Sequence, residues 1–193
     1  MPLDQPTAVV TDDAILSGAR AVFAAEGFET ATFAGLAASA GLSEADLAAR
    51  FPDKRALFTA VLVGLEKALD AHCRAASSDP AGRPMAMFIA GCRAALEFGG
   101  RRDFARIVMI EGPVVLGEEA WIDIDHGLGL PTLRQALRNI SPAAAESAVR
   151  PMAVMIMGAL NELMLALARG ERGVDIDASL VELERLLRAW AAR

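Results

Sequence analysis

Apolar residues recur at helical spacing along most of this chain. Ile15, Ala19 and Phe23 share one face of a predicted helix that begins after Thr11 and ends at Gly27. No stretch alternates apolar and polar residues for long enough to predict a half-buried strand, and the chain is rich in Ala and Leu, which favour helices. The pattern therefore predicts an all-α fold.

Two short helices follow the first one. One begins at Thr32 and ends at Gly41, and the next begins at Ser43, because a Ser or Thr hydroxyl can cap the free N–H groups at a helix start. Two short helices joined by a turn that contains glycine match the helix-turn-helix unit, whose second helix enters the major groove of DNA. Pro52-Asp53 ends the third helix and starts a long fourth one, predicted over 53–76.

The rest of the chain is predicted to form a helical bundle. Helices are expected over 84–98, 103–116, 118–125 and 130–140, then from Ser141-Pro142 with a kink or interruption at Pro151, and lastly from about 178 to 193. Gly127-Leu128-Gly129 is expected to break the chain between two of these helices. We divide the sequence into a flexible arm (1–10), a three-helix helix-turn-helix head (11–58) with a connecting helix (53–76), and a bundle (77–193), about nine helices in all.

Charge and composition limit where the protein works. The chain carries a formal charge of −6, and residues 1–58 hold four basic and eight acidic side chains, so a strongly basic surface for phosphate is not predicted. Residues 1–10 lack the basic start and apolar run of a secretory signal. The most apolar stretch, 151–168, is interrupted by Asn161 and Glu162. We therefore expect a cytoplasmic protein that does not contact a membrane.

Chemistry beyond binding is not expected. Cys73 and Cys92 have neither metal-ligand spacing nor the pattern of a disulfide framework. Sequence motifs of hydrolases, metalloproteases and phosphate-binding loops are absent. Asp123, Asp125 and His126 form a short polar cluster, which is typical of solvated or interface residues near a helix end. We therefore predict no enzyme activity, no metal and no cofactor.

The stretch from Ile15 to Phe58 carries a set of residues in a distinctive register. They are Phe23-Ala24-Ala25-Glu26-Gly27-Phe28, Thr32, Leu36-Ala37, Ala40-Gly41-Leu42-Ser43, Leu47, Phe51, Pro52, Lys54, Leu57 and Phe58. This stretch resembles the DNA-binding domain of TetR family regulators, and the runs 110–117 and 158–162 are similar to sensor domains in one TetR subgroup. The resemblance implies a homodimer joined by the last two helices of each subunit, double-stranded operator DNA as a partner, and a small-molecule effector bound in the bundle.

Six side chains are candidates for DNA contact: Thr32, Ser43, Glu44, Asp46, Arg50 and Lys54. Hydroxyls and cations at the ends of short helices can reach phosphates, but capping explains Thr32 and Ser43 equally well. Glu44 and Asp46 could accept from cytosine N4 groups, although acids in a first turn usually complement the helix dipole. Arg50 and Lys54 are candidates through the resemblance.

The third helix departs from the family pattern. Family members commonly carry Gly, Tyr and His there, whereas this chain has Ala45, Ala48, Ala49 and Arg50. Two hypotheses follow from this departure and from the acidic head. The first is a ligand-responsive regulator, a repressor that a small and mostly apolar effector releases from a palindromic operator. The second is a TetR-fold ligand-binding or protein-interaction module that has lost DNA binding.

Nine residues are candidates for ligand binding: Phe88, Cys92, Met109, Glu111, Trp121, His126, Met155, Asn161 and Glu162. Met side chains adapt to varied apolar ligands, and a polar group among apolar helices needs a partner. Asn161 is the first choice, with a hydrogen bond between helices as an equal alternative. We expect a closed, mostly apolar pocket that touches the fourth to eighth helices near Phe88, Met109, Trp121 and Asn161. A bundle with no cavity large enough for a small molecule of about 300 Å³ would count against ligand sensing.

The segments 151–168 and 178–190 are predicted to join two subunits, because their apolar faces are wider than one protomer needs to bury. The residues expected at this interface are Val154, Met157, Leu160, Met164, Leu167, Leu180, Val181, Leu183, Leu187 and Trp190.

Overall fold

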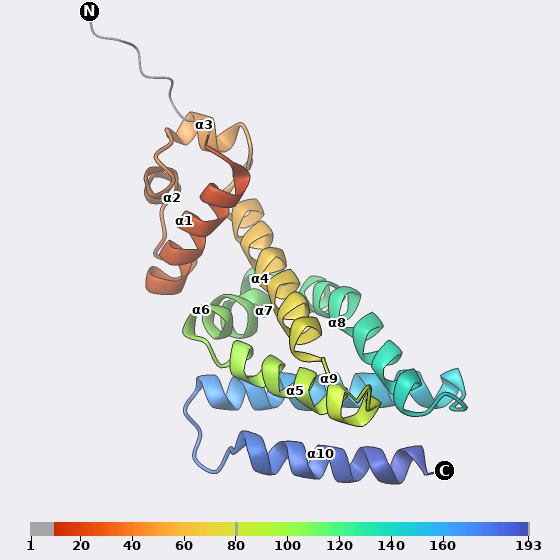
Figure 1. Ribbon diagram of the computed structural model, residues 1–193. Coiled ribbons are helices and arrows are strands. Elements are labelled where there is room, and N and C mark those ends of the chain that lie inside the picture. Colours follow the sequence, from red (N-terminus) through yellow and green to blue (C-terminus); the bar gives the residue numbers. More distant parts are fainter. Residues whose placement is uncertain (1–9, 80, 193) are drawn as a thin grey trace, which may run out of the picture. The chain divides into compact units, whose positions relative to one another are not determined.

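The computed structural model describes residues 10–79 and 81–192, and their regular structure is entirely helical (Figure 1). The helices are α1 (Asp12–Glu26), α2 (Phe33–Ser39), α3 (Glu44–Ala48), α4 (Lys54–Ala76), α5 (Pro84–Gly99), α6 (Arg102–Phe104), η1 (Ala105–Glu111), α7 (Gly112–Leu116), α8 (Glu118–Ile140), α9 (Glu146–Ala168) and α10 (Ile176–Ala191). Because α6, η1 and α7 are continuous, the described residues form nine helical segments. The all-α prediction is confirmed. Of the expected arm, only residue 10 lies within the described residues.

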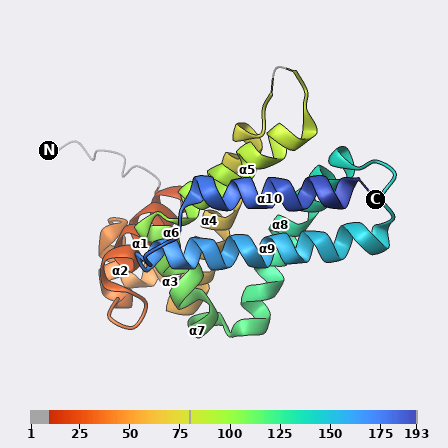
Figure 2. The ribbon, with the colours of Figure 1, turned by 90° about the horizontal axis from the view of Figure 1, so that it is seen from below.

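The chain divides into two compact units, of which the first ends at Val61 and the second begins at Leu62. This division falls inside α4. The first unit therefore consists of α1, α2, α3 and the start of α4, and the second of the remainder of α4 and all later helices. In the second unit, α9 and α10 run antiparallel to each other, and α5 packs against both (Figure 2).

Each helix of the first unit starts at a polar side chain that accepts a hydrogen bond from the first turn. A cap of this kind typically contributes about 1 kcal/mol to stability, so local sequence sets the helix starts. The caps are Thr11, Thr32, Ser43 and Asp53, which accept from the N–H groups of Ala14, Gly35, Asp46 and Ala56 at 3.3, 3.1, 3.1 and 2.7 Å.

Three phenylalanines form the centre of the first unit. The rings of Phe23 and Phe58 are fully buried and meet edge to face with centroids 5.1 Å apart. Phe28, in the loop after α1, packs edge to face on Phe58 at 5.2 Å. Such pairs add to the stabilisation that burial of the rings already provides. The aromatic cluster therefore joins α1 to the start of α4.

The Lys54 side chain fastens the loop after α1 to the start of α4. Its Nζ donates to the carbonyl oxygens of Phe28 at 2.7 Å and Ala31 at 2.9 Å, and more weakly to that of Glu29 at 3.4 Å. The same ammonium lies 4.4 Å from the centre of the Phe28 ring. Hydrogen bonds from a charged donor are stronger than neutral ones, so this side chain stabilises the first unit.

In the second unit, the expected break at Gly127-Leu128-Gly129 is wrong, because α8 runs unbroken from Glu118 to Ile140. A Cβ at Gly129 would overlap the terminal methyl of Met157 on α9. This glycine thus leaves room for the end of the Met157 side chain and does not mark a turn. Packing against α9 offsets the low helix propensity of glycine, which is about 1 kcal/mol per residue.

The helix expected over 103–116 is present, but its middle is widened into the π-helical segment η1. The indole Nε1 of Trp121 donates to the Val108 carbonyl oxygen in this segment at 2.8 Å. Arg106 and Glu111 pair within η1 at 3.0 Å. Wide turns of this kind leave backbone carbonyls available to other donors, so Trp121 helps to hold η1 in place.

The start of α9 also differs from the expectation. The helix begins at Glu146 and not at Ser141-Pro142, because the Ala144 N–H bonds to the Ser141 carbonyl and closes a turn that has proline in its second position. Pro151 lies inside α9 without ending it. This helix is the one described segment that is long and apolar enough to cross a membrane, but core helices of other proteins also meet that criterion.

We predict that Lys54→Met lowers the free energy of unfolding by about 2–3 kcal/mol, because the carbonyl oxygens of the loop after α1 lose a charged donor. Urea denaturation of the full chain measures this change. Lys67→Met is the matched control, since Lys67 lies exposed on the same helix, and it should change stability by less than about 0.5 kcal/mol. Equal effects of the two substitutions would contradict a structural role for Lys54.

Candidate functional site

The turn between α2 and α3 has helix-turn-helix geometry. Gly41 adopts a φ of +69°, a left-handed conformation that a side chain would strain, and the Leu42 N–H bonds to the Ala37 carbonyl at 2.9 Å. Leu36 and Leu47 are fully buried, one on each helix. Burial of these two side chains leaves the opposite sides of α2 and α3 exposed to a partner.

The hydroxyl candidates for DNA contact are used as helix caps. Thr32 caps α2, and Ser43 caps α3. Ser43 Oγ also donates to Asp46 Oδ2 at 2.6 Å, so the Asp46 carboxylate is turned back onto the cap. Glu44 is exposed in the first turn of α3. Capping thus accounts for Thr32 and Ser43, and contact of all four residues with DNA stays a prediction.

The cationic candidates are engaged within the first unit. Arg50 Nη1 donates to the Val10 carbonyl at 2.6 Å and to Asp12 Oδ1 at 3.0 Å. About a third of the Arg50 side chain remains exposed, against 69% of the Asp12 side chain. The Lys54 ammonium is held by two short hydrogen bonds to backbone carbonyl oxygens. Arg50 is therefore better placed than Lys54 to turn toward a phosphate.

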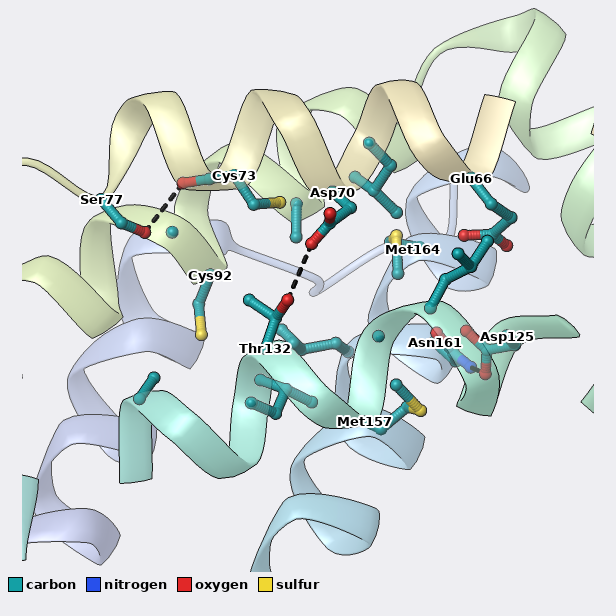
Figure 3. A pocket seen from close by; sticks show the side chains of 18 of the residues that line it. Glu66, Asp70, Cys73, Ser77, Cys92, Asp125, Thr132, Met157, Asn161 and Met164 are labelled. Atoms are coloured by element: carbon teal, nitrogen blue, oxygen red, sulfur yellow. Dashed lines mark hydrogen bonds between the residues drawn. The ribbon is translucent and has the colours of Figure 1, made fainter. Parts of the chain in front are cut away.

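The second unit holds a cavity of about 110 Å³ between α4, α5, α8 and α9 (Figure 3). Most of its wall is apolar, formed by Leu69, Phe88, Ala95, Leu128, Leu133, Ala136, Met157, Leu160 and Met164. It is smaller than the pocket of about 300 Å³ expected from the sequence and typical of small-molecule sites. A ligand of ordinary size is therefore larger than the space that this cavity holds.

One end of the cavity is polar. Glu66 from α4, Asp125 from α8 and Asn161 from α9 lie together there (Figure 3). Asn161 Nδ2 donates to Asp125 Oδ2 at 2.9 Å. Burial, and secondarily the charge of Asp125, raises the pKa of Glu66 to about 8, and burial also raises the pKa of Asp125. Near neutral pH the Glu66 carboxyl is therefore mostly protonated.

The third acid in the lining, Asp70, has partners of its own. One carboxylate oxygen accepts from Thr132 Oγ1 at 2.8 Å, and the other lies 2.8 Å from Arg74 Nη2. This hydrogen bond joins α4 to α8 across the cavity (Figure 3). Asp70 therefore links two helices of the cavity wall. Glu66, at the polar end of the cavity, has no such partner among the described residues.

Two cysteines also face the cavity. Cys92 is buried on α5 and Cys73 is half-buried on α4. Burial raises the pKa of Cys73 to about 11 and the pKa of Cys92 further still. Because the thiolate is the reactive form of cysteine, both side chains are inert thiols near neutral pH. They serve the cavity as small apolar groups.

Three of the nine ligand candidates line this cavity: Phe88, Cys92 and Asn161. The other six lie outside its lining: Met109, Glu111, Trp121, His126, Met155 and Glu162. Trp121 and Glu111 are bonded within and around η1, and 60% of Met155 is exposed. Asn161 donates to Asp125 on another helix, which is the role that the sequence offered as an alternative to ligand binding.

Sequence reasoning missed Glu66, the most deeply buried acid in the described residues, which is 6% exposed. A signal was present in the spacing. Leu62, Glu66 and Leu69 share one face of α4, so a glutamate interrupts a stripe of otherwise apolar residues. An acid on a buried helical stripe needs either a partner or a raised pKa.

The exposed apolar side chains of α9 and α10 differ from those expected at a subunit interface. Val154 and Met155 on α9, and Val181 and Leu186 on α10, are 40–66% exposed. Five of the residues expected at the interface pack inside the protomer instead: Met157, Leu160, Met164, Leu180 and Leu187. Only Val154 and Val181 are both exposed and among the residues expected at the interface. The exposed apolar face of α9 and α10 is therefore narrower than the expected interface and also includes other residues.

Within residues 10–79 and 81–192, no group of three or more His, Cys, Asp or Glu side chains is placed to hold a metal ion. Asp125 points to Asn161 and away from a shared site with Asp123, which is exposed. Two features of the described residues are candidates for binding a partner, an exposed helix-turn-helix and a cavity with a carboxyl pair at one end.

Comparison with known proteins gives the same division of the chain. The profile of the family described as "Bacterial regulatory proteins, tetR family" matches residues 15–61. The profile described as "Tetracyclin repressor-like, C-terminal domain" matches residues 85–190, more than half of the chain. No curated protein sequence matches this chain significantly.

Solved structures of similar fold cover nearly all of the chain. A TetR-family transcriptional regulator from Pectobacterium atrosepticum is 26% identical, with 94% of each chain covered and a TM-score of 0.72. A TetR-like regulator from Rhodococcus sp. RHA1 is 22% identical, covering 98% of this chain and 100% of that one, with a TM-score of 0.64. The fatty acid degradation regulator FadR from Bacillus halodurans is 16% identical, covering 91% and 93%, with a TM-score of 0.70. Together with the two profile matches, these likenesses show that the chain belongs to the TetR family of transcriptional regulators.

Proposed function

We propose that this protein is a cytoplasmic repressor that binds palindromic operator DNA as a homodimer and leaves it when a small, mostly apolar effector enters the cavity. The observation that carries this proposal is that α4 forms a wall of the cavity and also begins in the helix-turn-helix unit. Glu66 lies about three helical turns from Lys54 along this helix. A shift of α4 at the cavity therefore has a direct covalent route to the DNA-binding unit.

The small volume of the cavity supports a coupling of this kind. Most small-molecule pockets are about 300–1,000 Å³, so an effector must displace part of the wall around the present 110 Å³. Well-packed interiors respond to added volume by moving whole elements, because they are hard to compress. The effector would thus favour a second arrangement of α4. The difference between the effector's affinities for the two arrangements would set how strongly it weakens DNA binding.

On the DNA side, we propose that the exposed side of α2 and α3 faces the operator. Thr32, Ser43 and Arg50 would contact phosphates, with the two hydroxyls keeping their roles as caps. Lys54 would act mainly by holding the first unit together, because its ammonium is already bonded to loop carbonyls. Glu44 and Asp46 would mainly complement the dipole of α3.

The alternative function, a TetR-fold module that binds ligands without binding DNA, draws support from the acidic first 58 residues and from the pairing of Arg50 with Asp12. A gel shift with the DNA that flanks the protein's own gene separates the two. The repressor should retard this DNA at 50 mM salt and less at 200 mM salt, because phosphate contacts weaken as salt rises. Absence of retardation at both salt concentrations would favour the alternative.

We predict that Arg50→Ala weakens operator binding roughly tenfold and lowers the salt slope by about two, one phosphate contact per subunit. The substitution also breaks the pair with Asp12, so Asp12→Asn is the matched control. Asp12→Asn should leave binding unchanged or tighter, because it removes an acid and leaves Arg50 free to turn. If both variants weakened binding equally, Arg50 would act through the fold and not through phosphate.

We predict that the protein in solution has twice its monomer mass of 20.3 kDa, with α9 and α10 at the interface. Leu186→Glu should shift light scattering at micromolar concentration toward the monomer, since a charge on an apolar interface cannot be solvated there. Val114→Glu is the control, because Val114 is 81% exposed on α7. A dimer unaffected by Leu186→Glu would place the interface elsewhere.

A further inference from the structure

The Glu66 carboxyl is a buried polar group at the end of an apolar cavity, and the described residues offer it no hydrogen-bond donor. Its side chain is 6% exposed and lies beside Asp125 and Asn161 (Figure 3). The one amide donor in this corner, Asn161 Nδ2, is already directed at Asp125. A buried carboxyl without a donor is costly, so this corner is incomplete without a further group.

All ionisable carboxyl and basic groups in the cavity lining are acids. The lining contains three acids, Glu66, Asp70 and Asp125, and no Lys, Arg or His. Asp70 is balanced by Arg74 and Thr132. No cation pairs with Glu66 or Asp125 in the described part of the chain, although the charge of neighbouring His126 acts weakly on Asp125. The missing partner is therefore a cation and not a second acid.

The titratable groups that surround Glu66 do not supply this cation. Asp125 approaches it from α8, and Asp70 and Cys73 lie further along α4. Cys92 comes from α5, and α9 contributes only the neutral side chains of Met157, Leu160, Asn161 and Met164. Without a cation, Glu66 avoids the cost of a buried charge by keeping its proton near neutral pH.

We infer that the ligand of this cavity is a small apolar amine whose ammonium group binds between Glu66 and Asp125, with its hydrocarbon part among the apolar side chains of the wall. The inference rests on the proposed function in taking the cavity as the effector site. The three N–H bonds of an ammonium match three acceptors, namely the two carboxylates and the amide oxygen of Asn161. A desolvated pair of this kind is favourable only when both charges are satisfied, as they would be here.

Other ligand classes fit less well. Above the pKa of Glu66, which is about 8, a carboxylate ligand would bring a third negative charge to a corner that already holds two acids. A neutral alcohol could accept a hydrogen bond from protonated Glu66, so it is the closest competitor. The two can be separated by pH, because the attraction of an ammonium to Glu66 appears only when Glu66 ionises, whereas an alcohol can accept from the protonated carboxyl or donate to the ionised one and so depends less on pH.

Three probes of equal chain length test the inference: hexylammonium, hexanol and hexanoate. Calorimetric titration of the full-length protein, without DNA, should give at pH 8.5 an affinity for hexylammonium at least tenfold above that for hexanol, and no measurable binding of hexanoate. The affinity for hexylammonium should rise roughly twentyfold from pH 6.5 to 8.5, as Glu66 ionises around its pKa of about 8. Alkylammonium keeps its proton over this range, as the lysine side chain does.

Two matched substitutions locate the charge. Glu66→Gln keeps the size of the side chain and should abolish both the preference for hexylammonium and its rise with pH. Glu162→Gln removes an exposed carboxylate of α9 that lies outside the cavity lining, next to Asn161 in the sequence, and it should change the affinity by less than twofold. Thermal denaturation with and without hexanol checks that both variants keep a folded cavity.

Several results would overturn the inference. Equal binding of hexylammonium and hexanol, tighter binding of hexanoate, or equal effects of the Glu66 and Glu162 substitutions would each exclude a cation site at Glu66. Binding of hexanol alone would be consistent with the cavity as an effector site, but it would exclude an amine as the ligand. Absence of binding by all three probes would overturn the inference while leaving operator binding, which the gel shift measures separately, untouched.

Discussion

The buried stripe of α4 packs into the core of the first unit at its start and into the core of the second unit further along. In the first unit, Leu57 and Phe58 are fully buried, and Phe58 joins the aromatic cluster that holds α1. In the second unit the stripe continues through Leu62 and Leu65 to Glu66 and the cavity wall. One helix must therefore satisfy two cores at once, and a change in one part of the stripe changes the forces on the whole helix.

Much of the fold could be predicted because its signals are local. The caps at Thr11, Thr32 and Ser43 set the helix starts of the first unit where the sequence placed them. The unbroken α8 could not be predicted in the same way, because α8 packs against α9 and Gly129 leaves room there for the end of Met157, a residue far away in the sequence. The π-helical segment η1 likewise accepts a hydrogen bond from Trp121, which lies in α8.

The candidate site was predicted less completely than the fold. Asn161 was found because an amide among apolar residues is conspicuous in a sequence, and it does line the cavity. Met109 and Trp121 look equally suited to a pocket by residue type, but they pack around η1 because of tertiary contacts that no local pattern encodes. Glu66 was overlooked because acids on a long helix are usually solvated, and only its position on the buried stripe distinguishes it.

The burial of Glu66 also ties the stability of the empty protein to pH. The carboxyl titrates at its ordinary value of 4.5 in the unfolded chain and at about 8 in the folded one. Between these two values the folded state retains a proton that the unfolded chain has released, so the free energy of unfolding falls as the pH rises. Above pH 8 the folded protein must hold a buried anion, and its resistance to denaturation should be lowest there. Mildly acidic buffers are therefore the conditions in which the ligand-free protein should keep its fold best.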